Sequence, residues 1–324
     1  MIFDIKNENQ GDKKMAKITL HQGASIEETF KDFIISRKTK GLADKTIQSY
    51  NYHFNAIAHH LDIYKDITDL TKSDLDSMIE SMRGAEISAN SISTYTRCLR
   101  AFFSWCNEEC ITQINMKLYK GVETVKDTYT DRELEKLLKK PDIRKCGFAE
   151  YRDWVIVNFL LNSGSRAATI RAIQIRDIDF DNGLVHYRHT KNRRAQVIPL
   201  CSEMIKILRE YLRFRKGNDE DYLFCTENGL PLTENGLRIA ISRYNTRRGV
   251  NKTSIHLFRH TFARKYLIDC GGDAFTLQKL LGHSTLEMTK HYCAVFNADL
   301  TKNYDNFSPL AQMKQGGARI TLKR

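Results

Sequence analysis

Residues 256–260 read HLFRH and residues 280–292 read LLGHSTLEMTKHY, in a chain of 324 residues. On a helix, spacings of three and four place His256, Arg259 and His260 on neighbouring positions of one face. Such a face can hold a phosphate, because arginine and histidine both donate hydrogen bonds to anionic oxygens. The pattern H-x-x-R is weak by itself, since a basic chain with 10 histidines produces it about once by chance. Further motifs must therefore support it.

Two more motifs lie on either side of this helix in the sequence. Upstream, residues 162–170 read NSGSRAATI and place Arg166 at a predicted helix start. Downstream, His283 opens a short predicted helix, and Tyr292 follows nine residues later. The four groups therefore occur in the order arginine, H-x-x-R, histidine, tyrosine.

A β-ribbon is predicted between Arg166 and the H-x-x-R motif. Its strands are Leu184–Tyr187 and 196–200, and a polar turn over 189–194 joins them. The turn and second strand read TKNRRAQVIPL from Thr190, which places Lys191 in the turn.

Together these segments resemble the boxes of the tyrosine recombinase family of the lambda-integrase and Xer type. That family carries an arginine after a Thr/Ser-Gly turn, then H-x-x-R-H, then L-G-H followed by the tyrosine. The resemblance is close over residues 130–300 and looser over the preceding helices. It implies a site-specific DNA recombinase of the integrase or transposase kind. The implied catalytic residues are Arg166, Lys191, His256, Arg259, His283 and Tyr292.

The residue types suit phosphodiester cleavage. Attack by a weak nucleophile requires donors on the non-bridging oxygens, a route for the nucleophile's proton, and an acid for the leaving 5′-oxygen. Arg166 and Arg259 suit the phosphate because a guanidinium fork matches two oxygens. Tyr292 is the expected nucleophile and forms a 3′-phosphotyrosyl link, while His256 assists proton transfer.

Other roles rest on the resemblance. It makes Lys191 the general acid and His283 a phosphate donor, while His260 supports its neighbours. No metal and no cofactor are expected, because arginines replace a cation and the covalent intermediate conserves the bond energy. One position departs from the family, since Thr169 stands where an acidic residue is usual. Thr169 can keep a hydrogen bond but not a charge.

Charge and cysteine usage limit the possible partners. Lys and Arg total 51 against 39 Asp and Glu, a formal net charge of +12 that favours double-stranded DNA. The 8 cysteines contain no C-x-x-C pair, so neither a zinc site nor a disulfide framework is indicated. Without a long apolar run or a signal peptide, we expect a cytoplasmic, nucleoid-associated protein with no membrane partner.

Apolar periodicity predicts a mainly α fold with a small β-sheet. We expect a helical core-binding (SAM-like) bundle followed by a mixed α/β tyrosine-recombinase catalytic domain. The capping boxes Ser25 to Glu28 and Thr130 to Glu133 mark where the two domains begin. The predicted parts are a flexible arm (1–23), the bundle (24–117), a linker (118–128), the catalytic domain (129–306) and a C-terminal tail (307–324).

DNA contacts are predicted on the second and fourth helices of the bundle. Lys45, Gln48, Arg97 and Arg100 give these helices a polar face that can meet phosphates and base edges. An ordinary solvated surface is the alternative for this face. Arg243, in the second domain, is a further predicted contact.

Assembly is predicted from the resemblance alone. It implies a homotetramer on two DNA sites, a Holliday junction intermediate, and accessory DNA-bending or directionality factors. It also implies that a segment after Tyr292, at about 297–313, packs on a neighbouring protomer. The alternatives are a resolvase, an invertase, a type IB-like topoisomerase, or a catalytically weak DNA-binding regulator.

Overall fold

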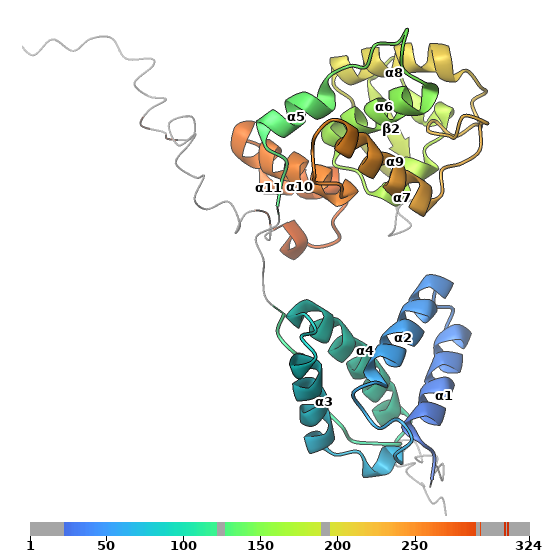
Figure 1. Cartoon of the computed structure of the whole chain (residues 1–324), viewed down its shortest axis with the longest axis vertical. Coiled ribbons are helices and arrows are strands. Elements are labelled where there is room, and N and C mark those ends of the chain that lie inside the picture. The colour runs from blue at the N-terminus through green and yellow to red at the C-terminus, as the bar shows by residue number, and fades with distance from the viewer. Residues whose placement is uncertain are drawn as a thin grey trace, which may run out of the picture. The chain divides into compact units, whose positions relative to one another are not determined.

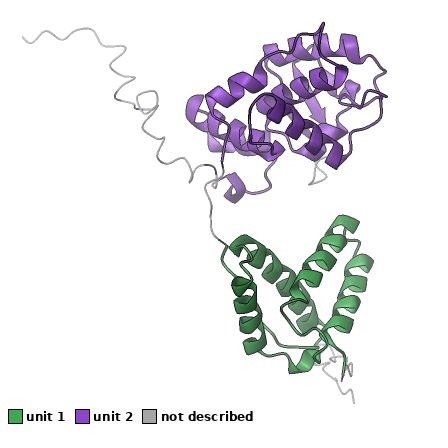
Figure 2. Ribbon diagram, viewed as in Figure 1, with its two compact units in different colours: residues 1–124 green, residues 125–324 purple. Residues whose placement is uncertain are grey.

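The structure, a computed structural model, describes residues 23–121, 127–188, 195–289, 292, 308 and 310. The chain divides into two compact units, residues 1–124 and 125–324 (Figure 2). Most of the predicted arm and tail, the middle of the predicted linker, and the ribbon turn at 189–194 lie outside the described residues. The predicted domain boundaries therefore stay predictions. No helix in the described part of the chain is long and apolar enough to cross a membrane.

The first unit is a helical bundle (Figure 1). Helices α2 and α4 pack together, and α1 packs against both of them. The four predicted helices are confirmed, with a short 3₁₀ turn, η1, before the third. Their bounds are α1 Ile26–Thr39, α2 Asp44–Ile57, η1 Ile67–Asp69, α3 Lys72–Gly84 and α4 Ala89–Glu108.

An aromatic cluster holds the bundle together. The rings of Phe30 on α1 and Phe54 on α2 stack with centroids 3.8 Å apart, and Phe102 on α4 meets Phe30 edge-on at 5.4 Å. Such pairs add to the free energy gained from burying apolar area. The Ser25 side chain accepts from the backbone N–H of Glu28, which fixes where α1 begins.

The second unit is mainly helical with a small antiparallel sheet in the order β1-β2-β3. The sheet gains a strand that the sequence did not predict, since β1 pairs with the start of β2. A strand of two residues is too short to show an alternating pattern of apolar and polar residues in the sequence. The elements are α5 Asp131–Leu138, α6 Phe148–Ser163, α7 Ala167–Ala172, η2 Ile175–Asp177, β1 Ile178–Asp179, β2 Leu184–Tyr187, β3 Gln196–Pro199, α8 Ser202–Arg215, α9 Glu234–Arg247, α10 Ile255–Arg264, the π-helical η3 Lys265–Asp269 and α11 Ala274–Leu281.

Helix α6 is the centre of this unit. Ten of its 16 residues are buried, and α5, α8, α9 and α10 pack around it. A helix with most of its residues buried needs such a complete cover. Helix α10 lies directly on α6, so the H-x-x-R segment is fixed against the buried centre of the unit.

Candidate active site

Two helix ends converge to form the site. Gly164 ends α6 with φ 59°, and Gly282 ends α11 with φ 61°, both in the left-handed region that favours glycine. A Cβ on Gly164 would lie 2.5 Å from a ring carbon of Phe262, and one on Gly282 would lie 2.6 Å from Oε1 of Gln196. Both positions therefore require glycine for conformation and for space. Arg166 and His283 follow these turns directly.

Arg259 joins the two helix ends. Its side chain is buried, and Nη1 donates to the Gly164 carbonyl at 2.9 Å while Nη2 donates to the Leu281 carbonyl at 2.9 Å. Nη2 also lies 2.8 Å from Nε2 of His283. These partners carry no negative charge, so the guanidinium is held in place without being neutralised.

Arg166 lies beside this pair as the N-cap of α7. Its Nη2 donates to the Gly282 carbonyl at 3.4 Å. Burial, together with the charge of Arg166, lowers the pKa of Arg259 to about 10. Burial also lowers the pKa of Arg166. Arg259 still carries its charge at neutral pH, and the two nearby cations favour binding of an anion.

His283 has a defined tautomer. Arginine has donors only, so Nε2 of His283 must be the acceptor of the contact from Arg259. Nδ1 therefore carries the proton and donates to Oγ1 of the buried Thr289 at 2.9 Å. The imidazole plane lies nearly parallel to the Tyr292 ring, with an interplanar angle of 11°.

Tyr292 is buried against Ala263, Leu277 and Leu281, with 6% of its surface exposed. Burial raises the pKa of its phenol, while the charges of Arg259 and Arg166 oppose that rise. The hydroxyl is therefore a neutral O–H at physiological pH. Its oxygen lies 3.0 Å from Nδ1 of His260.

The structure brings together Arg166, Arg259, His283 and Tyr292, four of the six residues predicted to be catalytic, and their catalytic role stays a prediction. His256 lies exposed in the first turn of α10. Lys191 lies outside the described residues. The contact from His260 to the tyrosine was missed because a sequence does not show which of two histidines one helical turn apart faces a distant side chain.

A second missed residue is Gln196, the first residue of β3. Its Nε2 donates to the carbonyl of Leu280 at 3.0 Å and to that of Lys279. The ribbon is therefore fastened to the end of α11 that also receives Arg259. A glutamine at the start of a strand has no sequence pattern that predicts this contact.

Thr169 is buried in α7, where the family pattern has an acidic residue. It lines a small pocket together with Asp177 and Arg188. Nε of Arg188 donates to Oδ1 of Asp177 at 2.6 Å, so the carboxylate in this pocket is paired.

The predicted DNA contacts are exposed, as contacts must be. Lys45 and Gln48 lie exposed on α2, Arg97 and Arg100 on α4, and Arg243 on α9. Arg243 also lines a basic pocket in the second unit with Arg152, Arg247 and Arg248. Exposure is compatible with both the DNA-contact and the solvated-surface interpretation.

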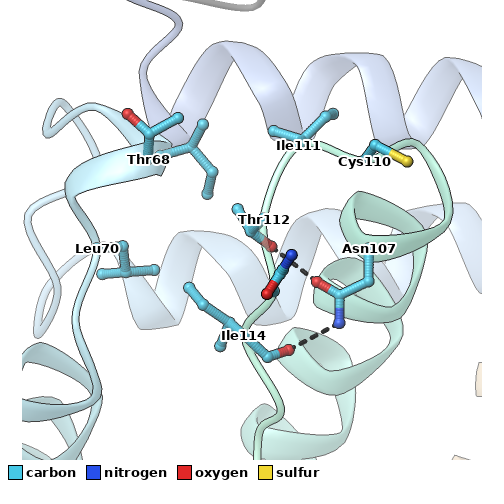
Figure 3. Close-up of a pocket in the computed structure, with 9 residues that line it drawn as sticks. Thr68, Leu70, Asn107, Cys110, Ile111, Thr112 and Ile114 are labelled. Atoms are coloured by element: carbon cyan, nitrogen blue, oxygen red, sulfur yellow. Dashed lines mark hydrogen bonds between the residues drawn. The ribbon is translucent and has the colours of Figure 1, made fainter. Parts of the chain in front are cut away.

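A larger cavity, of about 500 Å³, lies in the first unit. Figure 3 shows Asn107 in its wall, donating to the Ile114 carbonyl and accepting from Thr112. No basic side chain lines this cavity, so it offers no strong phosphate donor. Within the described ranges, no group of three or more His, Cys, Asp or Glu side chains could hold a metal ion.

A buried tyrosine beside two arginines, in a helical unit that follows a small bundle, defines a class of enzymes that break phosphodiesters through a tyrosine. Comparison with known proteins identifies the family. The model of the phage integrase family matches residues 128–298, and that of the phage integrase N-terminal SAM-like domain matches residues 28–115. The chain belongs to the phage integrase family. It is a tyrosine site-specific recombinase, or integrase, that acts on DNA.

Curated relatives match most of the chain. Tyrosine recombinase XerD of Staphylococcus haemolyticus is 28% identical over 284 residues, covering 84% of this chain and 95% of the relative. Tyrosine recombinase XerA of Pyrococcus furiosus is 27% identical over 273 residues, covering 83% and 90%. The family resemblance stated from the motifs is therefore confirmed.

Solved structures share the fold. The Tn1549 transposon integrase in complex with transposon right end DNA is similar with a TM-score of 0.70 at 20% identity, covering 83% of this chain and 94% of that chain. A lambda integrase dimer bound to a COC′ core site is similar with a TM-score of 0.67 at 18% identity, covering 82% and 97%. The predicted two-part, mainly helical fold is confirmed.

Proposed function

We propose that Tyr292 cuts DNA by attacking a phosphodiester that Arg166 and Arg259 hold, while His283 positions Arg259 through the contact of its Nε2. The observation that carries this proposal is the convergence of one buried hydroxyl and two guanidinium groups around the ends of α6 and α11. Preorganised donors of this kind stabilise the charge that develops on the phosphate oxygens.

The remaining steps follow from the chemistry. Attack by Oη forms the 3′-phosphotyrosyl bond as the bond to the 5′-oxygen breaks, and Lys191 gives that oxygen a proton. His256, at the exposed start of α10, donates to the phosphate or assists proton transfer. The covalent bond conserves the energy needed for religation.

At the level of the assembly, we propose that four protomers act on two DNA sites and exchange strands through a Holliday junction. The relatives named above are recombinases, and two similar structures contain DNA, one of them as a dimer. The substrate is therefore proposed to be a pair of sites on a mobile element, plasmid or chromosome. Accessory DNA-bending or directionality factors set the outcome.

The Tyr292→Phe variant tests the central claim. The change removes one oxygen and keeps the buried ring, so folding and DNA binding should stay normal while covalent protein–DNA adducts disappear. Adducts are trapped in cells with the unaltered protein, and the attached DNA is sequenced to identify the site. Normal adduct formation by Tyr292→Phe would refute the assignment and point to another nucleophile, such as Tyr304. A protein that only relaxes supercoiled plasmid would favour the topoisomerase alternative.

A further inference from the structure

The hydroxyl of Tyr292 needs a proton acceptor before it can attack. Its oxygen is buried, and burial raises the pKa of the phenol, so the attacking group starts as O–H. A phenolate is a much stronger nucleophile than a phenol, and a positioned base contributes about 10²- to 10⁴-fold to such steps. The acceptor must lie within hydrogen-bond reach of the oxygen.

His260 meets this requirement. Its Nδ1 lies 3.0 Å from the hydroxyl oxygen, and the two rings have centroids 5.5 Å apart. The half-buried His260 follows Arg259 on α10, which packs on α6. Its backbone is therefore fixed relative to the phosphate-binding arginines.

The other described groups around the hydroxyl cannot take its proton. Arg166 and Arg259 have donors only and stay charged. His283 uses Nε2 to accept from Arg259 and Nδ1 to donate to Thr289. In the neutral tautomer of His260 that carries its proton on Nε2, the hydroxyl of Tyr292 donates and Nδ1 accepts.

We propose that His260 is the general base of strand cleavage and the general acid of religation. As Oη of Tyr292 bonds to phosphorus, its proton passes to Nδ1 of His260, and the 5′-oxygen leaves with a proton from the proposed acid Lys191. In religation the 5′-hydroxyl attacks phosphorus, its proton returns to Lys191, and the imidazolium returns its proton to the departing tyrosine oxygen. His256 then serves the phosphate. This assignment rests on the proposed function of Tyr292.

Cleavage of two different DNA substrates distinguishes the proposed general base, His260, from the proposed general acid, Lys191. The probe is a duplex carrying a site recovered from trapped adducts, with either a normal linkage or a 5′-bridging phosphorothiolate, whose sulfur leaves without a proton. The His260→Asn variant keeps an oxygen near the place of Nδ1 but has no basic group. We expect its cleavage to fall by about 10²-fold or more on both duplexes. Lys191→Ala should be slow on the normal duplex and fast on the phosphorothiolate.

A second signature is chemical rescue. Added imidazole should speed cleavage by His260→Ala, because it restores a base in the space left by the ring. It should have no effect on cleavage by the control variant His59→Ala, which alters an exposed histidine of the first unit. DNA affinity and melting temperature show whether each variant is folded. If His260→Asn does not fold, His260→Gln, which also lacks a basic group, takes its place on both duplexes.

The outcomes keep the two proposals apart. If the unaltered protein forms no adduct on any recovered site, the proposed function fails. If it forms adducts and His260→Asn cleaves at the unaltered rate, the base assignment alone is wrong. Recovery of His260→Asn on the phosphorothiolate would also overturn it, because His260 would then act on the leaving group.

Discussion

At the scale of single residues, Arg259 does two tasks with one side chain. It spans the Gly164 and Leu281 carbonyls, and it donates to His283. A lysine has the same charge but only one nitrogen, so it cannot hold two helix ends and a phosphate together. We expect Arg259→Lys to lower the single-turnover cleavage rate by roughly 10²-fold or more, as for loss of a preorganised donor. Quenched adduct gels measure this rate.

The control for this exchange is Arg209→Lys on the exposed face of α8, away from the site. It should cleave at the unaltered rate, which shows that the exchange itself is harmless. A wild-type rate for Arg259→Lys would mean that positive charge alone is sufficient. The fork geometry would then have no catalytic role.

The motifs in the sequence predicted Arg166, Arg259, His283 and Tyr292 as catalytic because each has a fixed place in the order of the family boxes. They predicted His256 as catalytic and His260 only as a support for its neighbours, whereas the structure places His260 against the tyrosine. Both lie on α10, one turn apart, and the choice depends on how that helix is rotated against a tyrosine 32 residues beyond His260. Such a rotation is set by packing on α6, which no local pattern encodes.

At the scale of elements, periodicity predicted the long helices and the ribbon, because a 3.6-residue or two-residue repeat is visible within one window. The structure also shows that side chains from separate elements bind to the C-terminal end of α11, which no repeat in the sequence predicts. The carbonyls of Leu280, Leu281 and Gly282 receive Gln196, Arg259 and Arg166 in turn. A helix end has carbonyls without helical partners, so the site is built from groups that every helix leaves open.

This shared helix end gives a prediction for the ribbon. Gln196→Leu keeps the size of the side chain but removes the donor to Leu280 and Lys279, so β3 loses its attachment to α11. Lys191 precedes β3 by a few residues, and we expect the proposed acid to be misplaced. Cleavage of a normal duplex should fall by about 10-fold, matching roughly 1.4 kcal/mol for the loss of these two hydrogen bonds. A 5′-bridging phosphorothiolate should restore most of the rate.

The matched control is Gln113→Leu, an exposed glutamine in the first unit. This control variant should cleave each of the two duplexes at the rate of the unaltered protein. If Gln196→Leu stays slow on the phosphorothiolate, the attachment supports the arginines and not the ribbon. Normal cleavage of both duplexes would remove any role for Gln196.

At the scale of the whole molecule, the chain enters the second unit directly on the catalytic helix. The backbone N–H of Tyr129 donates to Oγ1 of Thr261 on α10, and its ring lies 4.5 Å from that of Phe258. Its hydroxyl accepts from Asn245 on α9. Each unit has its own core, and the contacts of Tyr129 fix the start of the second unit on α10, the helix that carries Arg259 and His260.

The segment after Tyr292 gives the last prediction. In the sequence, Leu300, Tyr304, Phe307 and Leu310 form an apolar stripe at spacings of four, three and three. Leu310, the one of these four that the structure describes, is 67% exposed in the single chain. An apolar stripe must be buried somewhere, and an exposed end favours burial on a neighbouring protomer. We expect truncation after Ala298 to leave binding to one DNA site intact and to lower recombination between two sites sharply.

Gel shifts on one site and a two-site plasmid assay measure these effects, and truncation after Met313, which keeps the stripe, is the matched control. The two truncations should differ only when two sites must be brought together, because a stripe that packs on a neighbour is dispensable for a protomer acting alone. Normal two-site recombination after the shorter truncation would rule out a role in assembly. A large drop in its melting temperature would instead show that the stripe packs on its own unit, where burying apolar area stabilises the fold of each protomer.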